Sequence, residues 1–165
     1  MLNIRKAEDD DFDGIWSIFR EIVIQGETYA FPPDTNKADA RKIWMLTPTA
    51  TYVALKHGEI VGTYYLKPNQ PGLGSHVCNA GYMVRSHVRG QGVGRAMCEH
   101  SLVEAKNLGF KAMQFNLVVK TNENAIRLWK KMGFFSVGTL PKAFMHKKLG
   151  LIDAIVMYKL LDCEI

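Results

Sequence analysis

Apolar positions recur along this chain with two periods, and the switches between the periods predict the order of its elements. Stretches that alternate apolar and polar residues, or form short apolar runs bounded by turn residues, indicate strands. Stretches with apolar residues three and four positions apart indicate helices. Strands are expected at residues 2–6, 51–56, 59–66, 76–84, 112–119, 134–139 and 151–160. Helices are expected at residues 12–23, 35–46, 92–108 and 122–132.

The resulting order is strand, helix, helix, three strands, helix, strand, helix, strand, strand. This order predicts an α/β fold in which about four helices cover a central mixed sheet of about seven strands. Two proline-containing stretches, residues 27–34 and 140–150, are expected to be loops because proline opposes regular pairing. The sequence contains no internal repeat or linker, so residues 1–165 are expected to form a single domain.

A glycine-rich turn joins one predicted strand to the helix that follows it. Gly90, Gly92 and Gly94 occupy alternate positions, with Arg89 and Arg95 on either side. Glycine lets a backbone turn sharply and approach a ligand closely. A turn that opens a helix also leaves the first N–H groups unpaired at the positive helix end. Because these donors suit a phosphate, the stretch predicts an anion-binding cradle between a strand and a helix.

The predicted cradle differs from two common phosphate-binding loops. A Walker loop ends in Gly-Lys-Ser or Gly-Lys-Thr, whereas this turn ends in Gly94-Arg95-Ala96. The dinucleotide fingerprint requires a third glycine at the position that Arg95 occupies here. A glycine-rich turn that binds no ligand stays open as the simpler alternative.

Composition and charge narrow the possible partners. The 165 residues are 47% hydrophobic and 22% charged, as in ordinary globular domains with a substantial core. The net charge of +5 and the pI near 9.1 suit an anionic ligand. The basic residues are scattered and no nucleic-acid-binding motif appears, so we expect no nucleic-acid partner.

Cysteines, histidines and apolar stretches exclude further classes of site. Cys78, Cys98 and Cys163 are few and far apart, which does not fit a disulfide framework. The five histidines lack the spacing of a metal site, so no metal is expected. No signal sequence follows Met1 and no apolar stretch is long enough to span a membrane. We therefore expect a cytoplasmic protein without a membrane partner.

Two motifs resemble those of the GCN5-related N-acetyltransferases. The first family motif is Arg/Gln-x-x-Gly-x-Gly/Ala, and residues 89–94, Arg-Gly-Gln-Gly-Val-Gly, fit every fixed position. The second is usually Asn…Ala-x-x-Leu-Tyr-x-x-x-Gly-Phe, and this chain has Asn122-x-x-Ala125-x-x-Leu128-Trp129-x-x-x-Gly133-Phe134. The order of the predicted elements is also that of the family, so the resemblance covers nearly the entire chain.

The resemblance implies a splayed sheet that binds acetyl-CoA where the strand before the first motif separates from the next strand. The pantetheine arm would pair with the backbone around Met83 and Val84, and the loop amides would hold the pyrophosphate. The N–H of Val84 would polarise the thioester carbonyl for direct attack by a neutral amine. Asn122 would bond the pantetheine, cap its helix, or do both. The expected cofactor-binding residues are Met83, Val84, Arg89, Gly90, Gln91, Gly92, Val93, Gly94, Arg95, Asn122 and Trp129.

Trp129 departs from the second motif, in which a tyrosine often serves as general acid to the departing thiolate. An indole N–H can donate a hydrogen bond but does not usefully release its proton. Trp129 is therefore expected either to form a wall beside the CoA sulfur or to be a core residue. Water is then the expected source of the thiolate's proton, because the thiolate of a thiol with a pKa of about 8.5 is a tolerable leaving group.

Two further resemblances suggest the acceptor. Residues 77–84 and 115–118 look like the branch of the family that acetylates toxic proline analogues such as azetidine-2-carboxylate. Residues 138–153 resemble the phosphinothricin-type enzymes, which act on small molecules. Those related enzymes usually carry an acidic residue near the position of Asn79, which is an amide here.

Two asparagines on successive predicted strands are the candidate acceptor-binding groups. We expect Asn79 and Asn116 to face the pocket together and, with the N–H of Val84, to be the catalytic groups. An amide can donate to a substrate carboxylate and accept from its amine without carrying charge. Tyr29 and Phe31 would close the apolar side of the same pocket. The simpler alternative is that both amides are structural and bond to nearby backbone.

Three functions therefore compete. The first is acetyl-CoA-dependent acetylation of a small-molecule amine, in particular an amino acid or its analogue. The second is acetylation of protein lysines or N-termini. The basic surface of this protein argues mildly against cationic protein tails as its substrates. The third is a CoA-binding sensor without catalysis, for which Trp129 is the hint. A homodimer is expected by analogy with the family alone.

Overall fold

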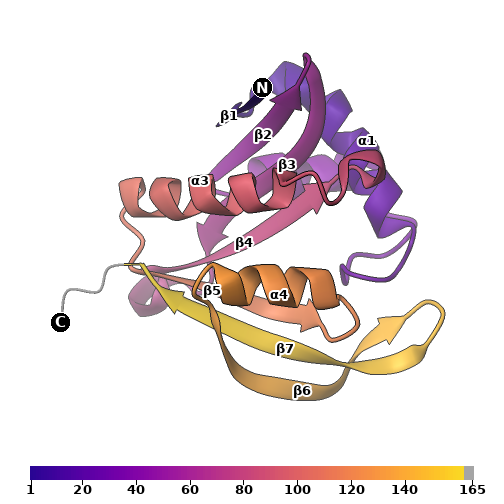
Figure 1. Cartoon of the computed structure of the whole chain (residues 1–165), viewed down its shortest axis with the longest axis vertical. Helices are drawn as coiled ribbons and strands as arrows, with labels where there is room; N and C mark the ends of the chain where they lie inside the picture. The colour runs from indigo at the N-terminus through magenta and orange to yellow at the C-terminus, as the bar shows by residue number, and fades with distance from the viewer. Residues whose placement is uncertain (162–165) are drawn as a thin grey trace.

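Seven strands form one mixed sheet in the computed structural model, which describes residues 1–161 (Figure 1). The strands are β1 (Leu2–Lys6), β2 (Ala50–Lys56), β3 (Glu59–Pro68), β4 (Val77–Val84), β5 (Ala112–Val119), β6 (Phe135–His146) and β7 (Gly150–Leu160). The helices are α1 (Phe12–Val23), α2 (Lys37–Arg41), α3 (Val93–Asn107) and α4 (Glu123–Lys131). Short helical turns lie at η1 (Asp9–Asp11), η2 (Lys42–Leu46), η3 (Gly72–Gly74) and η4 (Ser86–Val88).

The strand order β1-β2-β3-β4-β5-β7-β6 places β4 and β5 in the middle of the sheet. These two strands are parallel, whereas every other neighbouring pair is antiparallel. A parallel pair needs a crossover connection, and α3 supplies it. The predicted α/β fold with a mixed, splayed sheet of seven strands and four helices is confirmed.

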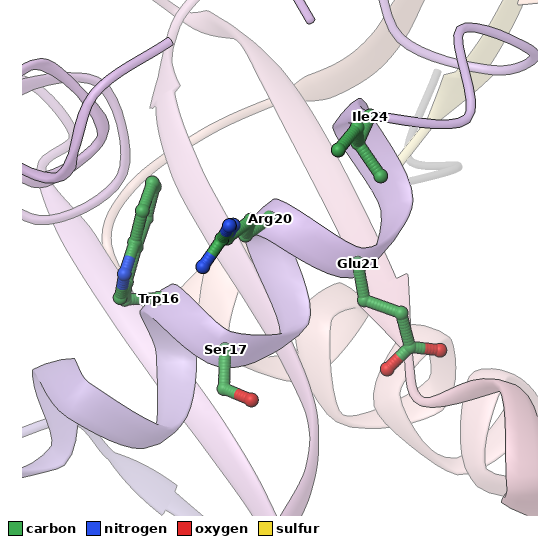
Figure 2. Close-up of a pocket in the computed structure, with 5 residues that line it drawn as sticks. All are labelled: Trp16, Ser17, Arg20, Glu21 and Ile24. Atoms are coloured by element: carbon green, nitrogen blue, oxygen red, sulfur yellow. The ribbon is translucent and has the colours of Figure 1, made fainter. Parts of the chain in front are cut away.

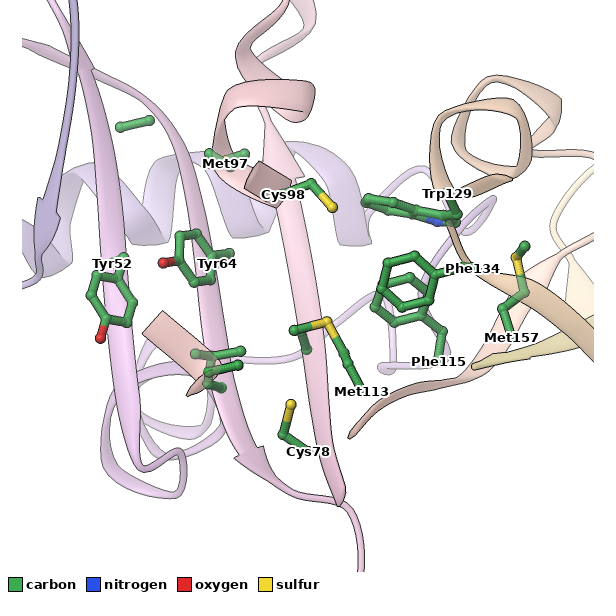
Figure 3. Close-up of a cluster of buried hydrophobic side chains, with 14 of the residues drawn as sticks. Tyr52, Tyr64, Cys78, Met97, Cys98, Met113, Phe115, Trp129, Phe134 and Met157 are labelled. Carbon is green, nitrogen blue, oxygen red and sulfur yellow. The ribbon is translucent and has the colours of Figure 1, made fainter. Parts of the chain in front are cut away.

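Helices cover both faces of the sheet and create two cores. On one face α1 packs against β3 and β4, and α2 packs against α1, around a core that includes the buried rings of Phe19 and Trp44. On the other face α3 and α4 cover a second core that includes Tyr64, Met97 and Trp129 (Figures 1 and 3). The periodic apolar stripes of the sequence are these buried faces, as the helical spacing requires.

Most element boundaries agree with the sequence pattern because local turn chemistry sets them. The hairpin between β2 and β3 turns at His57 and Gly58, both with left-handed φ angles of 52° and 81°. Such a two-residue turn matches the natural twist of antiparallel strands. The second predicted helix, residues 35–46, is in fact α2 followed directly by a π-helical turn, η2. Asn36 caps α2 by accepting a hydrogen bond of 2.9 Å from the N–H of Asp39.

The predicted loop at residues 140–150 is mostly strand, because β6 continues to His146 across Pro141. Proline lacks an N–H, so a strand tolerates it at the sheet edge or at a bulge. Both conditions hold here: β6 is an edge strand, and its register with β7 shifts between Leu140 and Phe144. Asp153 of β7 supports this bulge by accepting a hydrogen bond of 3.0 Å from the backbone N–H of Lys142.

Several expectations concern what the chain lacks. Within residues 1–161, no helix has the length and apolar composition that crossing a membrane would require. In the same range, no three His, Cys, Asp or Glu side chains are grouped so that they could hold a metal ion. Cys78 and Cys98 are free and buried, and Cys163 lies outside the described residues. Cytoplasmic location and a homodimer stay predictions.

Candidate functional site

The middle of the sheet opens between β4 and β5. The two strands pair over three residues, ending where Asn79 lies beside Gln114. Beyond that point the β4 segment of residues 80–84 has no partner on β5. β5 instead continues along β7, to which it pairs as far as Val119. The splay leaves one edge of β4 facing a gap, in the position that the sequence predicts for a cosubstrate.

The free edge of β4 presents backbone groups at alternate residues. Tyr82 turns its N–H and its C=O away from β3, because both bond to the hydroxyl of Tyr29 at 2.7 Å. In an antiparallel pair the edge used alternates along the strand, so Val84 faces the gap as Tyr82 does. Met83 turns its backbone toward β3 and its side chain into the α1-side core. The N–H of Val84 is therefore placed to polarise a carbonyl in the gap, whereas that of Met83 is not.

The glycine-rich turn lies at the open end of the gap, between η4 and α3. Gly90 and Gly92 have left-handed φ angles of 77° and 83°, which other residues rarely adopt. The first bond of the helix runs from the N–H of Ala96 to the carbonyl of Gly92 at 3.0 Å. The amides of residues 93–95 precede it and have no carbonyl within the helix to bond. These N–H groups and the positive helix end have the arrangement that the predicted anion cradle requires, and binding of an anion there stays a prediction.

The glycines are needed for reasons that differ along the turn. A Cβ added at Gly90 or Gly92 would meet nothing within 4 Å, so the left-handed backbone rather than crowding requires glycine there. Gly94 has ordinary helical geometry, and a Cβ there would lie 3.7 Å from Leu128 and 3.9 Å from Val84. A Cβ at Gly94 would therefore make ordinary van der Waals contacts with side chains of α4 and β4, which places Gly94 where α3 faces both elements.

The side chains of the turn are arranged around the amides. Arg89 is exposed and makes no side-chain hydrogen bond or ion pair within residues 1–161, which leaves its charge available to an anion. Arg95 is exposed and pairs with Glu99 at 2.8 Å. Gln91 accepts a hydrogen bond of 2.7 Å from Lys56. Val93 is buried and anchors the start of α3 in the core.

Helix α1 fastens the turn from the other face of the sheet. Glu21 accepts hydrogen bonds from the backbone N–H of Ser86, at 2.9 Å, and from its hydroxyl. Arg85 donates to the carbonyl of Ile60 at 2.9 Å and to the hydroxyl of Ser17 at 3.2 Å. A hollow of about 470 Å³ lies on the same stretch of α1 (Figure 2). The hollow is lined by Trp16, Ser17, Arg20, Glu21 and Ile24, so it lies outside the gap between β4 and β5.

Asn122 lies at the start of α4, and Trp129 lies on the buried face of that helix. The side-chain oxygen of Asn122 accepts from the N–H of Ala125 at 3.4 Å, which gives it the helix-capping role. Trp129 is buried, with its ring centroid 5.0 Å from that of Tyr82 and 4.8 Å from that of Phe115. Figure 3 shows the rings of Trp129 and Phe115 together beneath α4. Trp129 is thus a core residue of this face; contact with a cosubstrate stays a prediction.

Among the residues that the structure describes, 1–161, no buried hydroxyl or thiol near the gap is suited to give up a proton. The hydroxyl of Tyr82 lies 2.6 Å from that of Ser101, and burial raises its pKa well above the usual range. Burial likewise raises the pKa of Tyr29 above the usual range, which keeps its hydroxyl neutral. The thiols of Cys78 and Cys98 have pKa values raised by burial to about 12. A neutral thiol is a poor nucleophile, so a covalent cysteine intermediate does not fit this site.

The predicted acceptor residues lie on the α1 side of the gap but do not form one cluster. Tyr29 and Phe31 stack with ring centroids 5.6 Å apart, as expected for an apolar wall. Asn79 is buried, and its amide donates to the carbonyl of Gln114 at 3.0 Å. Asn116 is exposed and accepts from the side chain of Gln114 at 2.9 Å. Gln114 thus stands between the two asparagines, which do not bond each other.

Two members of this network were not predicted from the sequence. The hydroxyl of Tyr65 donates to the side-chain oxygen of Asn79 at 3.2 Å, and Gln114 bonds both asparagines. Their positions depend on register: Tyr65 lies opposite Gly81 on the neighbouring strand. The sequence offered one usable signal, since Gln114 is two residues before Asn116 and therefore shares its face of the strand.

The bonds of Asn79 predict a structural cost that Asn116 does not share. We expect Asn79→Ala to lower the free energy of unfolding by about 1–3 kcal/mol, because the Gln114 carbonyl and Tyr65 hydroxyl lose a buried partner. Asn116→Ala should change it by less than about 0.5 kcal/mol, because its exposed partners can turn to water. Urea unfolding of both variants measures the difference. Equal stability of the two variants would contradict a structural role for Asn79.

Residues 13–134 match the model of the acetyltransferase (GNAT) family. A GCN5-related N-acetyltransferase from Kribbella flavida has a similar structure, with a TM-score of 0.91 and 44% sequence identity over 96% of this chain and 97% of that chain. A phosphinothricin acetyltransferase from Sinorhizobium meliloti, solved with acetyl-CoA, has a TM-score of 0.86 over 96% of this chain and 88% of that chain. At 20% identity, that likeness shows the fold alone.

Two curated yeast proteins are also similar in sequence. The N-acetyltransferase aca1 of Schizosaccharomyces pombe is 40% identical over 98 residues, which are 59% of this chain and 47% of that protein. Protein SPT10 of Saccharomyces cerevisiae is 33% identical over 100 residues, 61% of this chain and 16% of that protein. The matched part thus spans less than half the length of either curated relative. The family match covers most of the chain and agrees with the splayed sheet and the glycine-rich cradle, and this chain belongs to the acetyltransferase (GNAT) family.

Proposed function

We propose that this protein transfers an acetyl group from acetyl-CoA to the amine of a small molecule, in particular an amino acid or a toxic analogue such as azetidine-2-carboxylate. The observation that carries the proposal is the gap between β4 and β5, with a left-handed glycine turn and the start of α3 at its open end. Family membership and the likeness to a solved N-acetyltransferase support the acetyl transfer.

The cradle and the free strand edge give the cosubstrate two kinds of contact. The N–H groups of residues 93–95 and the charge of Arg89 would bind the pyrophosphate of acetyl-CoA. The backbone of Val84, and that of Tyr82 where the arm displaces the hydroxyl of Tyr29, would pair with the amides of the pantetheine arm, as an added strand does. This arrangement leads the thioester along β4 into the gap, where the α1 side supplies the acceptor.

The chemistry requires one bond to form and one to break. The neutral amine of the acceptor attacks the thioester carbon, and the N–H of Val84 stabilises the negative charge that develops on the carbonyl oxygen. The carbon–sulfur bond then breaks, and the CoA sulfur leaves with the electron pair. The amine gives its proton to water and the thiolate receives one from water, because Trp129 cannot release a proton usefully.

Two loops on the acceptor side of the gap are tied to each other, which supports a small molecule over an extended peptide as the acceptor. The segment after α1 is tied to the turn between β6 and β7: the N–H of Lys147 donates to the carbonyl of Gly26 at 3.0 Å. Lys148 forms an ion pair of 2.7 Å with Glu27 across the same contact. Tyr29 fastens the segment to β4, as described above. Figure 1 shows these two loops at the same end of the sheet.

An acetyl-transfer assay tests the proposal directly. CoA release is followed with acetyl-CoA and a panel of amines that contains cyclic and linear amino acids, polyamines, and peptides with lysine or free N-termini. We expect turnover with small amines and none with peptides. Turnover with peptides alone would identify a protein acetyltransferase. Acetyl-CoA binding without turnover on any amine would identify a sensor. Either result overturns the proposal.

A further inference from the structure

Lys67 is an unpaired cation at the closed end of the gap. It lies on β3 directly opposite Asn79, the last residue of β4 that pairs with β5. The side chain is half-buried and makes no hydrogen bond or ion pair within residues 1–161. Other lysines of the chain do have acidic partners, as Lys37 has with Asp13 at 2.6 Å. A half-buried ammonium without a counter-ion suits the recognition of an anion.

The ring of Tyr65 holds Lys67 on the acceptor side. Tyr65 lies across Gly81: a Cβ added at Gly81 would be 2.6 Å from the Tyr65 ring and 3.1 Å from its hydroxyl. The ammonium of Lys67 lies 5.3 Å from the centroid of the same ring, within the range of a cation–π contact. Tyr65, Lys67 and Asn79 therefore share the face of the sheet on which α1 packs. Gly81 is next to Tyr82, whose backbone edge borders the gap.

We propose that Lys67 binds the carboxylate of the acceptor, so that the preferred substrates are amines that also carry a carboxylate. This inference rests on the proposed function and specifies its substrate class. In an amino acid the carboxylate is separated from the amine by a single carbon, so its binding group must lie close to the reacting carbonyl. Lys67 contacts the ring that covers Gly81, which lies three residues, about 10 Å, before Val84 on β4. An ion pair from Lys67 to the carboxylate, the acceptor itself, and a hydrogen bond from the N–H of Val84 to the carbonyl would together span a distance of that order. Its charge would align the amine without a nearby acidic residue.

The test compares one acceptor with and without its charge. kcat/KM is measured for azetidine-2-carboxylate and for azetidine-2-carboxamide, which has nearly the same shape but is neutral at that group. We expect wild-type protein to prefer the carboxylate by about ten- to a hundredfold, as for a hydrogen bond between charged groups. Lys67→Met should lower kcat/KM for the carboxylate to the level of the carboxamide and leave the carboxamide unchanged. Lys67→Arg should keep most of the preference.

Lys6→Met is the matched control, because Lys6 is exposed on the far edge strand and its loss changes the net charge equally. It should keep the wild-type preference. Binding of azetidine-2-carboxylate to the CoA-loaded protein, followed by calorimetry, gives a second readout that needs no turnover. An unchanged preference in Lys67→Met, or equal use of both acceptors by wild-type protein, would overturn the inference while leaving the acetyltransferase function in place. Failure of wild-type protein to acetylate any amine would overturn both.

Discussion

Gly92→Asp is expected to weaken acetyl-CoA binding on the order of a hundredfold while leaving the protein folded. Aspartate tolerates the left-handed backbone that Gly92 adopts, and its side chain would meet nothing within 4 Å. The new carboxylate would lie beside the amides that are proposed to hold the pyrophosphate. Two negative charges about 5 Å apart repel by about 3 kcal/mol at an effective dielectric constant of about 20, which corresponds to that loss. Isothermal titration calorimetry measures the dissociation constant.

Gly109→Asp is the matched control for this prediction. Gly109 has a φ of 86°, close to the 83° of Gly92, and a Cβ there would also meet nothing within 4 Å. It follows the opposite end of α3, so the substitution introduces the same strain and charge away from the cradle. We expect Gly109→Asp to bind acetyl-CoA as wild-type protein does. Near wild-type affinity in a folded Gly92→Asp variant would refute the cradle assignment.

The sequence predicted those parts of the fold that depend on local chemistry. The α1 stripe from Phe12 to Val23, the turn at His57 and Gly58, and the range of β5 agree with the structure because each depends on neighbouring residues. The strand β6 was shortened in the prediction because Pro141 is a strong local signal against pairing. Whether a proline is tolerated depends on the strand's place in the sheet, which local patterns do not specify.

In the candidate site too, features that depend on neighbouring residues were predicted, whereas features that depend on strand pairing were not. The geometry of the cradle was predictable because it depends on closely spaced glycines and a helix start, and the structure confirms the left-handed turn at Gly90 and Gly92. The α1 side was predicted only in part, because its contacts join residues far apart in sequence. The bond between Tyr65 and Asn79 and the cation of Lys67 above Tyr65 both depend on the register of β3 against β4. A pattern of apolar residues fixes which face a residue occupies but not its cross-strand neighbour.

Tyr82 contacts both faces of the sheet: its backbone bonds a residue on the α1 side, and its ring lies in the α3–α4 core. Its backbone faces the gap and bonds to Tyr29, while its ring packs on Trp129 in the α3–α4 core. Its hydroxyl bonds within that core to Ser101, which fixes the ring. A residue held at both its backbone and its side chain gives the strand edge a defined position. The edge that is proposed to receive the pantetheine arm is therefore fixed in position before the cosubstrate arrives, and the arm would replace the hydroxyl of Tyr29 at Tyr82.

The hydroxyl of Tyr29 bonds this edge of β4 in place of a neighbouring strand. Tyr29→Phe should therefore lower the stability of the protein, by an amount that depends on whether acetyl-CoA is bound. Without ligand, the variant leaves the N–H and C=O of Tyr82 without their protein partner, both bonded at 2.7 Å in the wild type. We expect the free energy of unfolding to fall by about 1–3 kcal/mol. For a domain of this size, the melting temperature should fall by roughly 2–4 °C for each kcal/mol. Thermal unfolding followed by circular dichroism measures this change.

With saturating acetyl-CoA, the difference in melting temperature between wild type and Tyr29→Phe should become smaller. The pantetheine amides are proposed to bond the same edge of Tyr82 and would supply the partners that the variant has lost. The increase in melting temperature caused by acetyl-CoA should therefore be larger in the variant than in the wild type. Tyr52→Phe is the control: its hydroxyl bonds Glu104 at 2.8 Å beside α3, away from the gap, so its deficit should be the same with and without acetyl-CoA. Equal acetyl-CoA-induced increases in wild type and Tyr29→Phe would mean that the cosubstrate does not use this edge of β4.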